Sequence, residues 1–432
     1  MIFMQNNNKP CILLISSANP CKGPGTGAIN MYNAFKDFDY EIDLLTLYQV
    51  PNRPDIKYIY KRKSKIRDIV SRIKKKLSRY PIGNYCFFYK KEKYPPIPPN
   101  KVLRKITKSY DIVLIYFWQE LLSFQTIDKI YDKLKCQFVF CCADYSPMSG
   151  GCHFTGDCTN YQSGCGCCPA FNSTNPNDFT HWNIQYRKKI YEKVQPIILG
   201  NTYMIESFFK KSYLLKDLNL KKISNIINHN IFKPLEPKIL YKQFNISPNK
   251  TNIIAFGCQS LTDKRKGMDY LLNALDIVYD NMTLEERNKT ILLFAGKNGD
   301  KIISRLKFDY KDLGFINPES LPAFYSISSL FLCSSIDDAG PSMLAQSIAC
   351  GTPLVSFKMG AALDLLLNQD TGYCAELCNT EDLAHGVLQI LRMPPIEYKK
   401  LRTNCTNVSQ KINSKEAFVN TIINEFINKK QL

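Results

Sequence analysis

Residues 331–360 read FLCSSIDDAGPSMLAQSIACGTPLVSFKMG, and this pattern predicts a strand, a loop, a short helix and a second strand. The apolar runs at 331–333 and 354–357 are typical of buried strands in a parallel sheet. Between them we expect a helix over 343–349 with Ser342 as its N-cap. A strand–helix–strand unit of this kind predicts an α/β fold.

Two carboxylates and a turn stand where the first strand of this stretch ends. Asp337 and Asp338 precede the turn residues Gly340 and Pro341, and the helix follows directly. A helix N-terminus beyond the carboxyl end of a parallel strand favours anions, because its unpaired N–H groups and its dipole point at the ligand. Carboxylates there repel phosphate but accept hydrogen bonds from sugar hydroxyls. The pattern fits a nucleotide-sugar, and an ordinary turn with solvated Asp residues is the alternative.

The length of the chain predicts two domains, because 432 residues exceed the size of one typical core. No apolar run reaches the roughly 18–20 residues that span a bilayer, so we expect a cytoplasmic protein. The 17 cysteines would then be thiols or metal ligands for the most part.

Much of the net charge of +19 lies in one segment, residues 57–79. This segment holds eleven Lys and Arg residues against a single acidic residue, Asp68. Apolar residues recur in it at helical spacing: Ile66, Ile69, Val70, Ile73 and Leu77. The pattern predicts a basic amphipathic helix suited to an anionic membrane surface. A solvated helix whose apolar stripe joins the core is the alternative, and nucleic acid is favoured only by charge.

The first half of the chain alternates predicted strands and helices, which indicates a parallel sheet. We expect strands at 11–16, 40–47, 111–117, 137–142 and 196–200. Gly25 and Gly27 follow the first of these strands and precede a helix. Such glycines allow a ligand to approach the backbone, although a plain tight turn is an equal alternative.

Residues 150–169 form a segment dense in cysteine. Four of its thiols are candidate ligands of a structural zinc ion: Cys152, Cys158, Cys165 and Cys168. Their spacing differs from the paired CxxC pattern, so a glycine-rich loop with free thiols, or a disulfide under oxidising conditions, stays open.

The second half begins with a predicted strand at 252–256, and Gly267 opens a predicted amphipathic helix. Arg265 and Lys266 therefore stand where a strand ends and a helix begins. There they could neutralise a diphosphate, and an exposed basic loop is the alternative. Further strands are expected at 290–296 and 312–316.

Two long motifs give this chain a resemblance to a known family. AFGCQSLTDKRKGMDYLLNAL (255–275) and SSIDDAGPSMLAQSIACGTPLVSF (334–357) resemble the donor-binding half of retaining GT-B glycosyltransferases, in particular the family-4 group of bacterial polysaccharide enzymes. DYSPMSGGCHFTGDCTNYQSGCGCCP (144–169) resembles the Cys-rich segment of the colanic-acid-type subgroup.

The resemblance implies a fold of two Rossmann-like domains that face each other across a cleft. Residues 1–230 would form the acceptor domain and 231–410 the donor domain. The segment 411–432 would be a helix that crosses back onto the first domain. A stripe of Phe418, Ile422 and Phe426 fits such a helix.

The resemblance also implies roles for individual residues of the second half. Asp338 and Gln346 match the positions of two family carboxylates, the first on the sugar hydroxyls of the donor and the second on the ribose. Lys266 matches the lysine on the diphosphate, and Arg265 or Lys264 would have to compensate for an arginine that is Cys258 here. Gly340, Pro341 and Ser342 match the loop that faces sugar and phosphate, and Gly314 matches a loop beside the base.

In the first half, the resemblance assigns Gly25 and Gly27 to the glycine-rich loop near acceptor and diphosphate. The subgroup often has His-Asp where this chain has Ala143-Asp144. Asp144 therefore remains as the candidate for contact with the acceptor or the sugar.

The implied activity is that of a retaining hexosyltransferase. It would move a sugar from a nucleoside-diphosphate sugar to a growing, lipid-linked surface polysaccharide such as a capsule, an exopolysaccharide or O-antigen. The chemistry in this family needs no metal, so zinc would be structural. The enzyme would lie at the anionic inner face of the plasma membrane as a peripheral protein, without a nucleic-acid partner.

Two other functions stay open. Gln346 and Ala143 stand at positions where the family has functional residues, which fits a catalytically inactive relative that binds nucleotide or carbohydrate. The charge and the cysteines also fit a basic, zinc-dependent nucleic-acid binder.

Overall fold

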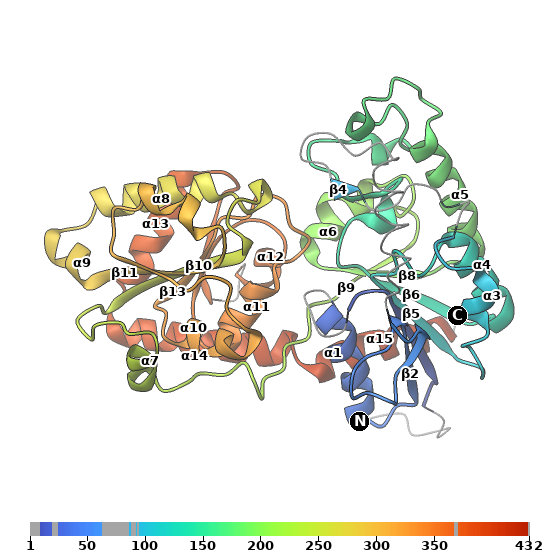
Figure 1. Cartoon of the computed structure of the whole chain (residues 1–432), viewed down its shortest axis with the longest axis horizontal. Coiled ribbons are helices and arrows are strands. Elements are labelled where there is room, and N and C mark those ends of the chain that lie inside the picture. The colour runs from blue at the N-terminus through green and yellow to red at the C-terminus, as the bar shows by residue number, and fades with distance from the viewer. Residues whose placement is uncertain are drawn as a thin grey trace. The chain divides into compact units, whose positions relative to one another are not determined.

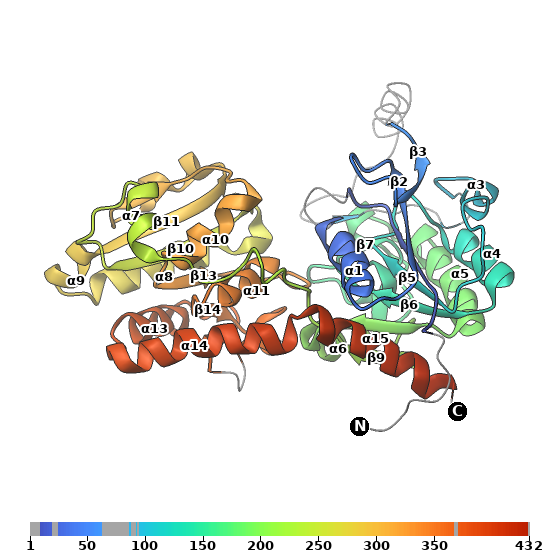
Figure 2. The same cartoon turned by 90° about the horizontal axis from the view of Figure 1, so that it is seen from below.

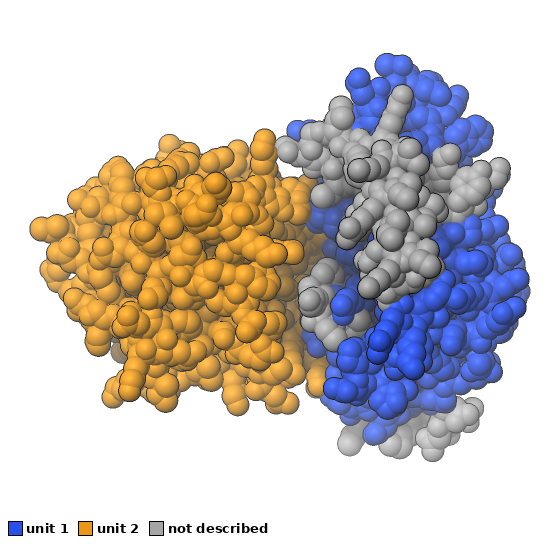
Figure 3. Space-filling view, viewed as in Figure 1, with its two compact units in different colours: residues 1–200, 204–223, 418–432 blue, residues 201–203, 224–417 orange. Residues whose placement is uncertain are grey.

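The computed structural model describes residues 9–19, 25–62, 86–87, 92, 95–366 and 370–430. The chain divides into two compact units, which Figure 3 shows in different colours. Unit 1 contains Met1–Gly200, Met204–Ile223 and Phe418–Leu432, and unit 2 contains Asn201–Tyr203 and Ser224–Ala417.

Unit 1 is built on a seven-stranded parallel sheet with the order β3-β2-β1-β5-β6-β8-β9. The strands are β1 (Ile12–Ser16), β2 (Ile42–Tyr48), β3 (Lys57–Tyr60), β5 (Ile112–Tyr116), β6 (Gln137–Cys141), β8 (Ile197–Gly200) and β9 (Asn219–Lys222). Every residue of β1 and β8 is buried, which is why the central strands are continuous apolar runs in the sequence. The helices are α1 (Gly25–Asp37), α3 (Pro99–Leu103), α4 (Phe124–Leu134), α5 (Phe179–Val194) and α6 (Thr202–Ser207), of which the first two residues belong to unit 2. Figures 1 and 2 show α4 and α5 side by side.

The Cys-rich segment of unit 1 is a loop with short 3-10 turns, anchored at its start. Its strand β7 (Cys152–Phe154) pairs antiparallel with β4 (Cys86–Phe87). From α5, the guanidinium of Arg187 donates to the carbonyls of Ser146 and Ser149, both at 2.5 Å. The same guanidinium pairs at 2.6 Å with Glu92, and both side chains are almost fully buried. Asn183 of α5 adds a hydrogen bond to the carbonyl of Gly150 at 2.8 Å.

Unit 2 contains a six-stranded parallel sheet with the order β12-β11-β10-β13-β14-β15. Its strands are β10 (Asn252–Ser260), β11 (Thr290–Lys297), β12 (Tyr310–Asp312), β13 (Leu330–Cys333), β14 (Leu354–Phe357) and β15 (Gly372–Ala375). Its helices are α7 (Pro237–Gln243), α8 (Met268–Asp280), α9 (Leu284–Lys289), α10 (Leu321–Ser326), α11 (Ser342–Ala349), α12 (Ala362–Leu365), α13 (Thr380–Leu391) and α14 (Pro395–Ile412). The two parallel sheets confirm the predicted α/β class with two Rossmann-like units.

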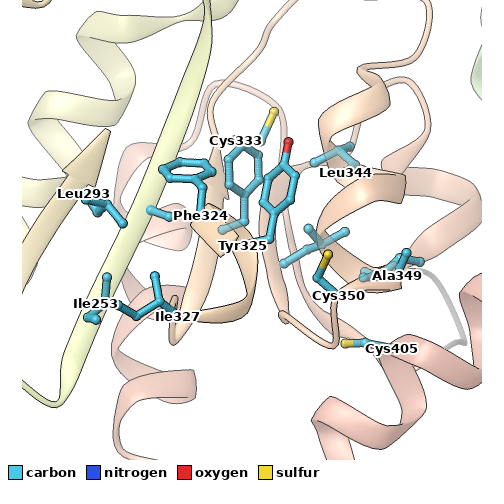
Figure 4. Packing of buried hydrophobic residues seen from close by; sticks show 14 of the residues in the cluster. Ile253, Leu293, Phe324, Tyr325, Ile327, Cys333, Leu344, Ala349, Cys350 and Cys405 are labelled. Carbon is cyan, nitrogen blue, oxygen red and sulfur yellow. The ribbon is translucent and has the colours of Figure 1, made fainter. Parts of the chain in front are cut away.

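Helices cover both faces of the unit 2 sheet. Ile253 and Ala255 of β10 lie in one apolar cluster, together with residues of α10, α11 and α14. Ile254 and Phe256 point to the opposite face, into a cluster with residues of α8 and α13. Figure 1 shows these two helical layers with the strands between them, and Figure 4 shows the first cluster around Tyr325.

The last helix, α15 (Lys415–Lys430), lies largely in unit 1. The predicted stripe is confirmed, since Phe418, Ile422 and Phe426 are all buried. Phe418 makes an edge contact with Phe35 of α1 at 6.2 Å between ring centroids. An ion pair between Glu425 and Lys221 holds the helix beside β9 (Figure 2). No helix among the described residues is both long and apolar enough to cross a bilayer.

Three local predictions were wrong. Residues 57–60 form the edge strand β3 and no helix, because Thr46 and Tyr48 of β2 offer them a pairing edge; residues 63–85 of the predicted basic helix lie outside the described residues. The strand predicted at 312–316 lies earlier, as β12. Ser342 is the first residue of α11, whose N-cap is Pro341 without a side-chain hydrogen bond.

Candidate functional site

Two segments far apart in the sequence meet at the carboxyl ends of β10 and β13. Gly267 ends the short turn after β10 with φ of 60°, and a Cβ atom on it would lie 2.0 Å from the carbonyl oxygen of Ser334. The hydroxyl of Ser334 donates to the carbonyl of Lys266 at 2.9 Å. The carbonyl of Arg265 accepts from the backbone N–H of Ile336 at 2.8 Å. Only glycine permits this approach, which brings the basic turn against the acidic loop.

Lys266 and Asp338 form an ion pair at this meeting point. Their side chains are 19% and 13% exposed, so the pair is reachable from solvent but largely enclosed. Burial lowers the pKa of Lys266, but the charge and hydrogen bond of Asp338 outweigh it and raise that pKa, so the ammonium stays charged. The second carboxylate oxygen of Asp338 accepts from the N–H of Gly340 at 2.9 Å. The structure thus brings three of the predicted site residues together.

The loop between Asp338 and α11 is tightly shaped. Gly340 has φ of 159°, and a Cβ atom on it would lie 2.9 Å from the side chain of Asn201, which itself donates to the carbonyl of Ala339. Pro341 follows and Ser342 begins α11, exposed to solvent. The backbone of the predicted loop is therefore fixed beside the ion pair.

Gln346 lies on α11, four residues after Ser342, and is partly exposed. Its Oε1 accepts a hydrogen bond from the hydroxyl of Tyr325 at 3.0 Å. Tyr325 is fully buried, and burial raises its pKa well above the ordinary value. Sequence reasoning missed this tyrosine, because in the apolar run LPAFYS it is indistinguishable from a core residue.

Two other predicted site residues, Arg265 and Gly314, hydrogen-bond to aspartates other than Asp338. The guanidinium of Arg265 donates to Asp263 at 2.7 Å. Its positive charge also acts on Lys266, where it partly offsets the rise in pKa that Asp338 causes. Gly314 lies after β12 in a left-handed turn with φ of 59°, where its N–H donates to Asp312 at 2.8 Å. β12 is the edge strand, two positions from β10, so Gly314 lies farther along the same sheet edge.

In unit 1, Asp144 follows β6 and is almost fully buried. One carboxylate oxygen accepts from the N–H of Ser146 at 2.8 Å, and the other lies 2.6 Å from Nδ1 of His153. The sequence placed His153 only beside a cysteine, so this carboxylate–imidazole pair was missed. It forms because β7 folds back beside the end of β6, and the local sequence does not indicate this contact.

Gly25 and Gly27 lie in the first turn of α1, beyond the carboxyl end of β1. A Cβ atom on Gly27 would lie 2.5 Å from the hydroxyl of Tyr116. Gly27 therefore allows close packing against β5.

The four predicted zinc ligands lie near one another, but they do not form a metal site. Burial raises the pKa of Cys152 well above its ordinary value, and the thiols of Cys168, Cys165 and Cys158 raise it further. Burial also raises the pKa of Cys165 to about 12 and that of Cys168 to about 11. Over the described part of the chain, no group of three or more His, Cys, Asp or Glu side chains is arranged to hold a metal ion. The predicted zinc site is therefore not supported within the described residues.

A family model matches most of the second unit. Residues 241–411 match the family model described as glycosyl transferases group 1. N-acetyl-alpha-D-glucosaminyl L-malate synthase of Bacillus anthracis is 20% identical over 179 residues, which cover 40% of this chain and 45% of that protein. The match thus spans less than half the length of this curated relative.

Solved structures are similar over almost the whole chain. Sucrose-phosphate synthase from Thermosynechococcus elongatus has a TM-score of 0.64 at 15% identity, with 98% of this chain and 100% of that one covered. HepE of Anabaena, in complex with UDP and glucose, has a TM-score of 0.61 at 13% identity, with 98% and 100% covered. At this identity the likeness shows the fold. Residues 241–411, which include the Lys266–Asp338 pair, therefore match the glycosyl transferases group 1 model, within a chain that has the GT-B fold.

Proposed function

We propose that this protein is a retaining glycosyltransferase that uses a nucleoside-diphosphate sugar as donor. The Lys266–Asp338 pair, at the carboxyl edge of the sheet in the group 1 domain, carries the proposal. A diphosphate leaving group needs a fixed positive charge, and the hydroxyls of a sugar need an acceptor beside it. A charged lysine and a partly enclosed carboxylate supply both.

The proposed roles follow the positions of the residues. Lys266, supported by Arg265, would stabilise the charge that develops on the diphosphate, and Asp338 would accept from sugar hydroxyls. The other donor contacts would be the backbone of Gly340, Pro341 and Ser342, the Gln346 side chain at the ribose, and Gly314 beside the base. In unit 1, Asp144 would contact the acceptor or the sugar, with Gly25 and Gly27 in the loop nearby.

UDP is the first nucleotide to test, because HepE, a protein of similar fold, holds UDP and glucose. The acceptor we propose is a growing, lipid-linked surface polysaccharide, as in the colanic-acid-type subgroup that the Cys-rich segment resembles. The eleven basic residues of 57–79 favour a cytoplasmic enzyme that docks peripherally on an anionic membrane surface.

Thermal unfolding with UDP-, GDP-, ADP- and dTDP-linked sugars tests the donor site. We expect one nucleotide class to raise Tm by several degrees, since a ligand that binds only the native state stabilises it. Lys266→Ala should abolish this rise. Lys250→Ala is the matched control, because Lys250 is also largely buried and pairs with Asp309 at 2.5 Å elsewhere in unit 2. No rise with any of the four classes would contradict the proposal.

An inactive relative is the second candidate, favoured by Gln346 at a position that resembles a family carboxylate. It predicts binding of the nucleotide-sugar without release of nucleoside diphosphate across a broad acceptor panel. The cysteines do not support the hypothesis of a zinc-dependent nucleic-acid binder, because no metal site is found within the described residues.

A further inference from the structure

Tyr325 is buried beneath α11, the helix that follows the loop of the proposed donor site. Its ring lies in the core of unit 2, with Phe324 and Phe331 at 5.3 and 5.5 Å between centroids. Its own carbonyl accepts from the hydroxyl of Thr352 at 2.6 Å, and the Thr352 carbonyl accepts from Ser347 of α11 at 3.1 Å. Figure 4 shows the hydroxyl of Tyr325 on the side of Leu344, which belongs to α11. The hydroxyl therefore has a fixed position beneath this helix.

That hydroxyl decides how the Gln346 amide is oriented. A glutamine side chain has one carbonyl oxygen, which accepts, and one NH2 group, which donates. The carbonyl oxygen accepts from the Tyr325 hydroxyl at 3.0 Å. If the amide turned by half a rotation, its NH2 group would face the hydroxyl, and the buried hydroxyl hydrogen would lose this acceptor. The bond therefore directs the NH2 group away from the core.

We propose that Tyr325 is a positioning residue that makes Gln346 a hydrogen-bond donor toward the ligand. The inference rests on the proposed function, in which Gln346 contacts the ribose of the nucleotide. The ribose must then accept at this point, through a 2′ or 3′ oxygen. A glutamate at this position would accept only and would require a ribose hydroxyl that donates. The glutamine thus reverses the polarity of the contact while the side chain keeps its length.

Analogues that can accept but not donate separate the two polarities. We would measure Kd for UDP, 2′-deoxy-2′-fluoro-UDP and 3′-deoxy-3′-fluoro-UDP, or for the matching compounds of the base that thermal unfolding selects. The wild type should lose less than threefold with either analogue. Gln346→Glu should lose at least tenfold with one of them, relative to its own affinity for UDP. A tenfold loss in the wild type, or equal discrimination by both proteins, would overturn the proposal.

Removal of the hydroxyl tests the role of Tyr325 itself. Tyr325→Phe should weaken UDP binding by threefold to tenfold, because the amide is then free to turn. Tyr398→Phe is the matched control: Tyr398 lies in the same unit, and its hydroxyl donates to the carbonyl of Ser329 at 2.8 Å. This control should leave Kd unchanged, and an unchanged Kd in both variants would overturn the proposal.

A double-mutant cycle of Tyr325→Phe and Gln346→Ala, followed by urea unfolding, keeps this inference separate from the proposed function. Coupling between the two changes is expected whether or not nucleotide is present. If the wild type binds no nucleotide, the proposed function fails, while the coupling still reports the Tyr325–Gln346 bond. Independent effects of the two changes would overturn the inference.

Discussion

Gly267 is the residue on which the approach of the two site segments depends. Gly267→Ala should destabilise the protein by more than about 2 kcal/mol, because a left-handed alanine costs roughly 1–2 kcal/mol and its Cβ would also collide with the Ser334 carbonyl. Urea unfolding measures this change, and the nucleotide-induced rise in Tm should fall with it.

Gly314 offers the matched control for this prediction. It has nearly the same φ, 59° against 60°, but a Cβ atom on it would meet nothing within 4 Å. Gly314→Ala should therefore cost only the conformational part, about 1 kcal/mol. Equal losses in the two variants would show that the contact with Ser334 does not constrain the loop.

Among single residues, those that could be predicted from the sequence lie next to a strand end and a turn. Lys266, Asp338 and Gly340 each sit at a strand end beside a turn, and the structure brings them together. Tyr325 and His153 could not be predicted, because their partners lie 21 residues and 9 residues away and are reached only through the packing of other elements. The predicted zinc site is not supported for a related reason: the spacing of cysteines along the sequence does not show how their side chains are arranged in space.

Helix α9 is tied to the end of α13 by one carboxylate, which gives the fold an acid-sensitive contact. The hydrogen bond from Arg392, at 2.7 Å, and the capping-box contact with Thr283 hold the pKa of Glu286 down at about 2. A depressed pKa adds stability above the unfolded pKa near 4.5, and this stability is lost as pH falls toward 2. Because the side chain is partly exposed, we expect a loss on the order of 1 kcal/mol.

Arg392→Met should flatten this acid dependence, and urea unfolding between pH 5 and pH 2 would show the change. Lys289→Ala removes an exposed pair with Glu285 on the same helix, so it serves as the control. If Arg392→Met and the wild type lose the same stability over this range, the contact is not the source of the acid dependence.

Elements in the middle of the two sheets were predictable, and elements at the edges were less so. The central strands β1, β5, β13 and β14 are almost entirely buried, so their continuous apolar sequences predict a strand and little else. β3 and β12 are short edge strands with partly exposed residues, and their charged side chains matched other patterns as well. Pairing with a neighbouring strand decides such segments, and a single sequence does not show the neighbour.

The whole molecule is two parallel-sheet units that share one chain, and α15 returns the chain to unit 1. Phe418→Ala should destabilise unit 1 by about 3–5 kcal/mol, because it removes a buried aromatic that contacts Phe35. Both tryptophans, Trp118 and Trp182, lie in unit 1, so tryptophan fluorescence in urea reports this unit alone. Ile427→Ala, at an exposed site of the same helix, should change little.

A stable unit 1 in Phe418→Ala would mean that α15 is dispensable for it.

Two parallel sheets were predictable from the alternation of apolar runs and helical patterns. The return of the last helix rested on the family resemblance, because a helix stripe shows that a partner exists but not which one.

The anchoring of the Cys-rich segment acts on backbone carbonyls where the segment begins. Arg187 and Asn183 hold the backbone carbonyls of Ser146, Ser149 and Gly150, and Glu92 balances the charge of Arg187. Every amino acid supplies a carbonyl, so the bonds to residues 146 and 149 survive when those side chains change. Glycines set the limit: a Cβ atom on Gly150 would lie 2.5 Å from the carbonyl oxygen of Thr180, and one on Gly166 would lie 2.0 Å from that of Pro176. A chimera with a foreign loop would therefore have to keep these two glycines as well as Glu92, Asn183 and Arg187.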